Sequence, residues 1–201
     1  VEIGAGAQLT GNYSGLTDVG CAAVHISGAS ILTEAGSLIT VGDAGGPPVG
    51  QVVLQVASNF AGPGPAIDLS GDITAESLSV ALNVNNDFRI RDGDINVINN
   101  FDVHTYGYFI VDDPASISSE GNVVFNADGG MIIDGDLTGD RIYLVGGGLD
   151  GLSVNGGLFA RETINLYGVF GGDVVIGGYA ILESDTDNLT SIGESTGINI
   201  T

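Results

Sequence analysis

Three short acidic stretches carry oxygen ligands at alternating positions, as the first half of a calcium-binding loop does. The stretch DGDLTGD supplies Asp134, Asp136 and Thr138, and Gly139 follows. Val145 stands at the twelfth position, where such a loop needs a bidentate glutamate. The stretch therefore predicts at most half of a calcium site, with weak binding, and we expect no other cofactor.

The two other stretches are also incomplete. RDGDIN supplies Asp92, Asp94 and Asn96, but Val97 takes the position of the glycine. ESDTDN supplies Glu183, Asp185 and Asp187. The G-G-x-G-x-D repeat of calcium-binding β-rolls does not occur. Because the chain is so acidic, polar residues at turns are the commoner explanation of all three stretches.

Residues suited to catalysis are sparse. The two histidines, His25 and His104, lie far apart in the sequence. RIR, from Arg89 to Arg91, and the pair Asp112 and Asp113 resemble fragments of polygalacturonase-like hydrolases. These fragments stand in the wrong order and without the Gly-His-Gly element of that group. We therefore expect no enzyme, and keep a carbohydrate-active enzyme as the alternative.

The balance of charge limits the partners. The 201 residues include 25 Asp and Glu but only four basic residues, all arginine, for a net charge of −21. Nucleic acid and anionic membranes attract basic patches, which four scattered arginines cannot form, so we expect neither as a partner. No apolar stretch reaches the roughly 20 residues of a membrane helix, so we expect no membrane insertion.

Strand patterns recur along the whole chain, whereas no window of about a dozen residues has clean helical periodicity. Segments such as SLSVALNV (77–84), TYGYFIVDD (105–113) and DVVIGGYAILES (173–184) are rich in β-branched and aromatic residues. Gly, Asn and Asp, which tolerate tight turns, separate these segments. The sequence therefore predicts an all-β protein.

An internal repeat favours one kind of all-β fold. Apolar anchors recur every 19 to 24 residues, at Leu9, Ile31, Leu54, Leu78, Phe101, Val123, Ile142 and Ile164. A period near 22 residues suits one coil of a three-sided parallel β-helix, so the chain would form about eight to nine coils. An antiparallel β-sandwich or jelly roll is the alternative, because it also has many short strands.

Two Pro- and Gly-rich segments interrupt the pattern. Residues 41–50 and 59–68 contain four of the five prolines, which cannot donate to a sheet ladder. We expect loops here on a single solenoid domain spanning residues 1–201, with a domain boundary near 60–70 as the alternative. Cys21 is the only cysteine, so it has no internal disulfide partner; a buried thiol is expected and an intermolecular disulfide is the alternative.

The repeated phrases point to a known group. The stretch from Gly139 to Gly168, with GNVVFNADGG (Gly121–Gly130) and GDITAESLSV (Gly71–Val80), resembles filamentous haemagglutinin-like passengers of two-partner secretion and autotransporter adhesins. The resemblance covers mainly residues 70–180. It implies a right-handed parallel β-helix on a bacterial surface.

The functional expectation is an extracellular structural or adhesive protein at the cell surface. A solenoid has an unpaired strand edge at each end, which can template another chain. We therefore expect a self-assembling filament or matrix subunit, with a host, cell or surface receptor as a further partner. A non-polymeric segment of a large secreted adhesin is the alternative. The expected assembly contacts are Val1, Glu2, Ile3, Ile198, Asn199, Ile200 and Thr201.

Overall fold

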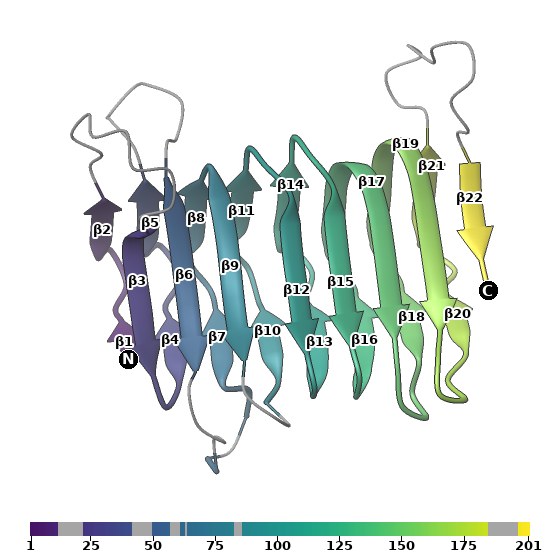
Figure 1. Ribbon diagram of the computed structural model, residues 1–201, viewed down its shortest axis with the longest axis horizontal. Coiled ribbons are helices and arrows are strands. Elements are labelled where there is room, and N and C mark those ends of the chain that lie inside the picture. The colour runs from purple at the N-terminus through teal and green to yellow at the C-terminus, as the bar shows by residue number, and fades with distance from the viewer. Residues whose placement is uncertain (12–21, 42–49, 57–60, 63, 83–85, 185–196) are drawn as a thin grey trace.

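The chain is a parallel β-solenoid, seen in a computed structural model that describes residues 1–11, 22–41, 50–56, 61–62, 64–82, 86–184 and 197–201 (Figure 1). These residues form 22 strands, and every pairing between them is parallel. The antiparallel sandwich is therefore wrong. The described residues form no helix, and so none that could cross a membrane.

Each coil contributes a strand to each of three faces. The first face is an eight-stranded sheet of β1 (Glu2–Ile3), β4 (Ile31–Thr33), β7 (Ile67–Leu69), β10 (Phe88–Ile90), β13 (Tyr108–Val111), β16 (Gly130–Ile133), β18 (Leu152–Val154) and β20 (Val174–Ile176). The second face holds β2 (Gln8–Gly11), β5 (Leu38–Val41), β8 (Asp72–Ala75), β11 (Asp94–Val97), β14 (Ser116–Ser119), the first halves of β17 (Asp136–Gly146) and β19 (Gly157–Gly168), and β21 (Ile181–Ser184). The third face holds β3 (Ala22–Gly28), β6 (Gln51–Val56), β9 (Ser77–Leu82), β12 (Phe101–Thr105), β15 (Val123–Ala127), the second halves of β17 and β19, and β22 (Gly197–Ile200).

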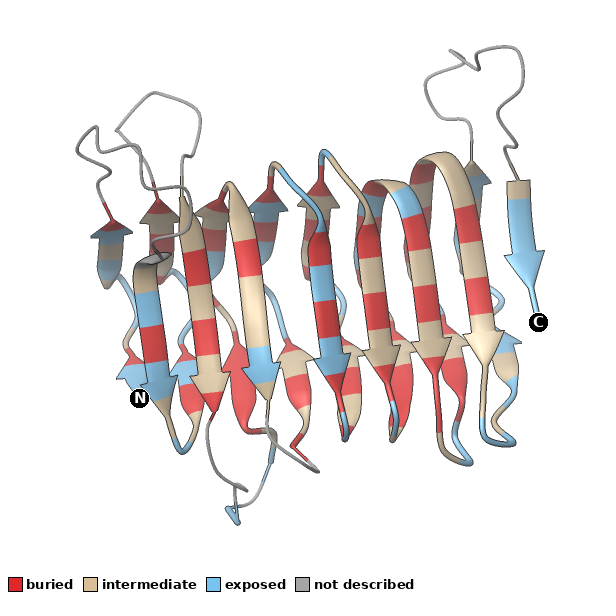
Figure 2. Cartoon of the chain, in the orientation of Figure 1, coloured by how far each residue is buried: buried red, intermediate tan, exposed pale blue. Residues whose placement is uncertain are grey.

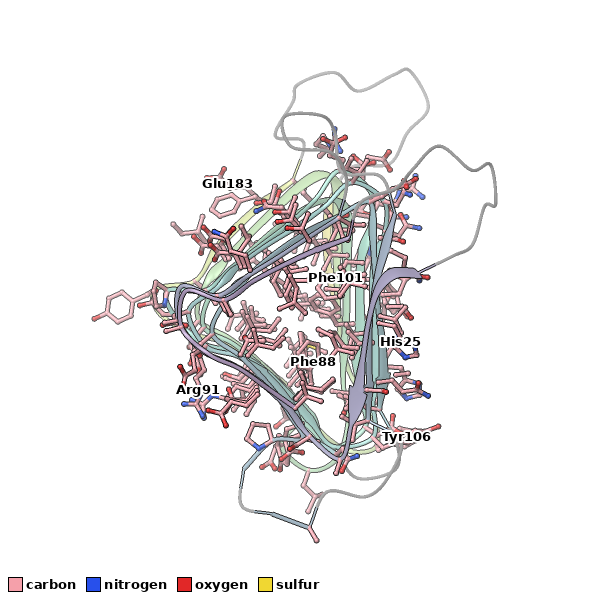
Figure 3. All side chains as sticks on the ribbon, turned by 90° about the vertical axis from the view of Figure 1, so that its left-hand side faces the viewer. His25, Phe88, Arg91, Phe101, Tyr106 and Glu183 are labelled. Atoms are coloured by element: carbon pink, nitrogen blue, oxygen red, sulfur yellow. The ribbon has the colours of Figure 1, made fainter. Side chains whose placement is uncertain are left out.

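The predicted right-handed β-helix is confirmed. In Figure 1 the coils advance from left to right, and the third-face strands near the viewer run downward while the second-face strands behind them run upward. Viewed along the axis in Figure 3, the coil is triangular. The first sheet has eight strands, one from each coil, which is the lower end of the expected eight to nine; six of these coils lie between two neighbours. At about 4.8 Å per coil the rod is roughly 35 Å long.

Alternate strand residues point inward and stack in register, coil on coil. We call four of these stacks the core columns, because they run from the first coil to the last. They begin at Ile3, Leu9, Val24 and Ile26 and end at Ile176, Leu182, Ile198 and Ile200. A side chain in an inner coil is covered above and below by its own column, and the inner coils therefore exclude water.

The predicted repeat is correct over its second part. Leu78, Phe101, Val123, Ile142 and Ile164 are register partners in the column that runs from Val24 to Ile198. The first three anchors were wrong: Leu9 and Leu54 belong to two other core columns, and Ile31 lies on the first face. The column partners Val24, Val52 and Leu78 lie 28 and 26 residues apart, because the earlier coils contain longer connections.

Four phenylalanines fill the middle of the core. Phe88, Phe101, Phe109 and Phe125 are all 0% exposed. The ring of Phe125 lies 5.1 Å from that of Phe101 and 4.6 Å from that of Phe109, both edge-on. Figure 3 shows Phe88 and Phe101 pointing into the coil. Edge-to-face pairs of this kind add to the stabilisation from buried area, so the cluster stabilises the coil of β10–β12 and the coil of β13–β15.

All four arginines join one coil to the next. Arg89 pairs with Asp112 at 2.6 Å and Arg91 with Asp68 at 2.6 Å. Arg141 pairs with Glu162, and Arg161 pairs with Asp140. Each pair joins residues 21 to 23 positions apart, about one coil. The four guanidinium groups therefore all serve inter-coil contacts, and most carboxylates in the described part of the chain have no arginine beside them.

The two expected loops are partly outside the described residues, which leave out 42–49, 57–60 and 63. Val41 ends β5, and Ile67 and Asp68 belong to β7, so one end of each segment lies in a strand. The first sheet continues through β4, β7 and β10 across this region. The single domain and the alternative boundary stay predictions, and Cys21 also lies outside the described residues.

Candidate functional sites

Within residues 1–201, the core of the last coil has no further coil on its outer side. Ile176, Ile198 and Ile200 are 38%, 42% and 51% exposed. Their column partners in the preceding coil, Val154, Ile164 and Leu166, are all 0% exposed. Figure 2 shows the change from mostly buried strands to the mostly exposed β22. Within the described residues, the inward-facing apolar side chains of the last coil are therefore covered on one side only.

The backbone of the last coil is also available on one side. Among the described strands, β20 pairs only with β18, and β21 and β22 pair only with β19. The opposite edge of each strand carries N–H and C=O groups in the spacing that a further parallel strand would use. This end of the rod combines an open core with an open sheet edge.

The N-terminal end differs. Ile3 and Ile26 belong to the first coil and yet are only 5% and 6% exposed. Leu9 and Val24 are half-buried, and Val1 is 52% exposed. The first-coil strands β1, β2 and β3 each pair only with the second coil among the described strands. This end thus offers strand edges, but less uncovered apolar surface than the other end.

The seven expected assembly residues divide into different environments. Ile198 and Ile200 end core columns, while Asn199 lies between them and donates a hydrogen bond to the side chain of Asn165 at 3.0 Å. The backbone of Thr201 bonds to Leu166 and Gly168 of the preceding coil. Ile3 is buried, whereas Val1 and Glu2 are exposed. The described contacts all lie within one chain, so the role of these residues in assembly stays a prediction.

The first calcium candidate occupies a coil corner and the start of β17. Asp134 accepts a hydrogen bond from the Asn155 amide at 2.6 Å, and Asp136 accepts one from the Gly157 N–H at 2.8 Å. Both carboxylates bond to the next coil, and Thr138 is exposed on β17. Such bonds satisfy backbone and amide groups at the corner, as expected for polar corner residues.

The second calcium candidate has the equivalent position two coils earlier, at a coil corner and the start of β11. Asp94 accepts a hydrogen bond from the Ser116 hydroxyl at 2.6 Å, and Asn96 is exposed beside it on β11. Asp185 and Asp187 of the third stretch lie outside the described residues. Within the described part of the chain, no three His, Cys, Asp or Glu side chains are grouped to hold a metal ion. Calcium binding stays a prediction.

A polar groove lies on the outside of the rod where the first face turns toward the second. It encloses about 510 Å3 and is lined by Arg89, Arg91, Asp92, Asp112, Asp113, Pro114 and Asp134. We call it the arginine–aspartate groove. It brings together RIR and the pair Asp112 and Asp113, which the sequence places some 20 residues apart. Figure 3 shows Arg91 on this outer surface.

The groove is held by bonds between coils. Arg91 donates two hydrogen bonds of 2.6 Å to Asp68, which raise the pKa of Arg91 above its usual value. Arg89 donates to Asp112 at 2.6 Å. These pairs fix both guanidinium groups against neighbouring coils, so the lining is already ordered.

The repeat could have revealed the groove from the sequence. Arg91, Asp112, Asp134 and Asn155 follow one another at intervals of 21, 22 and 21 residues, close to one coil. Residues one period apart stack in a solenoid. These residues lie in the part of the chain where the predicted period is correct, but the anchors were apolar core residues and the polar residues at the coil corners were not aligned with them.

Comparison of the chain with protein-family models, with curated proteins and with solved structures gave no match.

Proposed function

We propose that this chain is a rigid rod of an extracellular, cell-surface filament or matrix fibre, in which successive copies stack end to end. The observation that carries the proposal is that the last described coil can take a further coil, since 38% to 51% of the residue is exposed at the outer end of three core columns within residues 1–201. Apolar side chains gathered in one exposed patch favour a partner that covers them.

A second copy has the surface to continue the coil. Stacking the copies head to tail would place β1 beside β20, β2 beside β21 and β3 beside β22, with the parallel pairing found at every internal step. Leu9 and Val24, which are half-buried, would cover Leu182 and Ile198. The new interface would repeat the contacts that already hold the coils together.

The parallel β-solenoid fold is consistent with the resemblance to haemagglutinin-like and autotransporter passengers. That resemblance supports a role at a cell surface and adhesion to a host, cell or surface receptor. A rod of stacked coils suits such a role because each coil is fixed by its two neighbours. We include adhesion in the proposal for this reason.

The net negative charge should make assembly depend on the salt concentration. Each copy carries a net charge of −21, so two copies repel one another at low ionic strength. Salt screens this repulsion, with a Debye length of about 10 Å at 0.1 M and about 3 Å at 1 M. Sedimentation velocity should therefore show larger particles as salt rises, and negative-stain images at high salt should show linear rods.

A matched pair of variants tests the open end. Ile176 ends a core column, while its neighbour Val175 points outward and is 53% exposed. Ile176→Asp should abolish assembly because it places a charge at the join, whereas Val175→Asp should leave most of it. Equal loss in the two variants, or a monomeric wild-type protein under all conditions, would overturn the proposal and favour a non-polymeric segment of a larger adhesin.

Mixing experiments determine the polarity. If the copies stack head to tail, Ile176→Asp and Leu9→Asp should each stay monomeric alone, and their mixture should give dimers and nothing larger. Circular dichroism of each variant checks that it is folded. A wild-type protein that stops at dimers, together with a Leu9→Asp variant that still dimerises, would show tail-to-tail pairing and would contradict the filament.

A further inference from the structure

The arginine–aspartate groove lies away from both ends of the rod, and stacking of copies would not use it. Its lining residues come from three successive coils, those that begin with β10, β13 and β16. The side chains therefore repeat along the rod axis at the coil spacing of about 4.8 Å. The groove is thus an extended, repeating surface rather than a single closed pocket.

Two carboxylates in the groove are not bonded to another coil, although Asp92 interacts electrostatically with Arg91. Asp92 and Asp113 take part in no hydrogen bond or ion pair with the described part of the chain. Asp112 and Asp134, in contrast, are bonded to Arg89 and Asn155. The free carboxylates can accept hydrogen bonds from a ligand, and the guanidinium groups have further N–H donors to offer beyond their ion pairs.

The mixture of charges limits the ligand class. An anionic ligand would meet four carboxylates in the lining, and a cationic one would meet two guanidinium groups held in place. A metal ion is also disfavoured, since the described residues contain no group of side chains able to hold one. Hydroxyl groups both donate and accept, so a neutral ligand rich in hydroxyls can use both kinds of side chain.

We propose that the arginine–aspartate groove binds a neutral polysaccharide lying along the rod axis. Asp92 and Asp113 accept hydrogen bonds from sugar hydroxyls, and the free N–H groups of Arg89 donate to sugar oxygens. A pyranose ring is similar in length to the coil spacing, so successive sugar units can meet successive coils. The preformed ion pairs keep the lining ordered before binding, which lowers the entropic cost of association.

The test measures binding to immobilised polysaccharides. The wild-type protein is passed over neutral xylan, mannan and β-glucan, over anionic polygalacturonate, and over polylysine as a cationic probe. We expect retention on at least one neutral polysaccharide and none on polygalacturonate. Asp92→Asn and Asp113→Asn should each weaken binding about tenfold, the effect of losing one charge-assisted hydrogen bond.

A matched control separates the groove from general charge. Asp173 is an exposed carboxylate outside the groove, so Asp173→Asn changes the net charge equally and should not alter binding. Ile176→Asp should also bind normally, because the groove does not depend on assembly. Retention on polylysine alone, no retention on any neutral polysaccharide, or equal binding by Asp113→Asn and wild type would overturn the proposal. Release of reducing ends from the bound polysaccharide would overturn it in favour of an enzyme.

Discussion

The last two coils contain nearly the same kinds of side chain in different surroundings. Leu166 and Ile200 are partners in one core column, yet Leu166 is 0% exposed and Ile200 is 51% exposed. The same holds for Ile164 and Ile198, which are both isoleucine. Burial in this fold is therefore produced by the next coil, and not by the residue or its strand alone.

This comparison indicates that the folded state is stabilised mainly by the contacts between neighbouring coils. Covering an apolar side chain contributes about 25 cal/mol per Å2, so an inner coil benefits on both of its sides and the last coil on one. Solenoid stability is in general the sum of such nearest-neighbour terms. Substitutions in inner coils should consequently cost more than the same substitutions in the last coil.

The largest effect is expected at the centre of the phenylalanine cluster. Phe125→Ala removes a ring that contacts Phe101 and Phe109, and should lower the free energy of unfolding by roughly 3–5 kcal/mol. Phe159→Ala is the control, because Phe159 is only half-buried on β19. Denaturant unfolding measures both changes, and similar losses in the two variants would contradict a stability concentrated in the inner columns.

The second effect tests the two coils directly. Leu166→Ala should cost about 2–5 kcal/mol, whereas Ile200→Ala should cost less than about 1 kcal/mol, since half of Ile200 is already in water. Unfolding is measured at low protein concentration, so that no second copy covers the last coil. If Ile200→Ala proved as costly as Leu166→Ala, the described exposure of the end would be wrong.

The third effect concerns two glycines that both have a positive φ angle. Gly151 and Gly171 have φ angles of +62° and +91°, which favour glycine. A Cβ on Gly151 would lie 2.1 Å from the backbone oxygen of Asp173 in the next coil, whereas one on Gly171 would meet nothing within 4 Å. We expect Gly151→Ala to cost roughly 1–3 kcal/mol more than Gly171→Ala, because only it crowds a neighbouring coil. Equal melting temperatures would contradict this.

The smallest effect is electrostatic. Partial burial raises the pKa of Asp102 on β12 above its usual value of 3.8. Because the folded chain then holds this proton to higher pH than the unfolded chain, the charged carboxylate disfavours folding above the folded pKa, and this cost disappears as the pH falls below 3.8. Asp102→Asn should slightly raise stability at pH 7 and leave it unchanged at pH 3. Thermal melts at both pH values test this, and a destabilised variant at pH 7 would contradict it.

The sequence was sufficient for the fold because the solenoid repeats its own signal. Apolar couplets and glycine turns in residues 78–164 set the correct period, and Ile142 and Ile164 are indeed register partners. The earlier register could not be read in the same way, because connections of variable length carry no periodic pattern. Thr33 could not be assigned to the core from an apolar pattern either, because it is a polar residue. It is nevertheless buried in a core column, where its hydroxyl accepts hydrogen bonds from the N–H groups of Ser70 and Gly71.

The candidate sites were less predictable. Ile198 and Ile200 could be named as residues of the last coil from their position. Their exposure could not be predicted, because it depends on which residues stack in the core columns. The groove was present in the sequence only as RIR and two aspartates. Their meeting depends on which residues stack across coils, and Arg91 and Asp112 are brought together by β10 and β13 pairing in register.

The pairing of each coil with its neighbours alone has a mechanical consequence. A pull on the two ends of the rod would act on the terminal coil first, since its described strands pair only with those of the adjoining coil. Each coil that detaches releases about 22 residues of chain, or roughly 70 Å when extended. The molecule would then lengthen in steps of about one coil under tension, while the remaining coils stay folded.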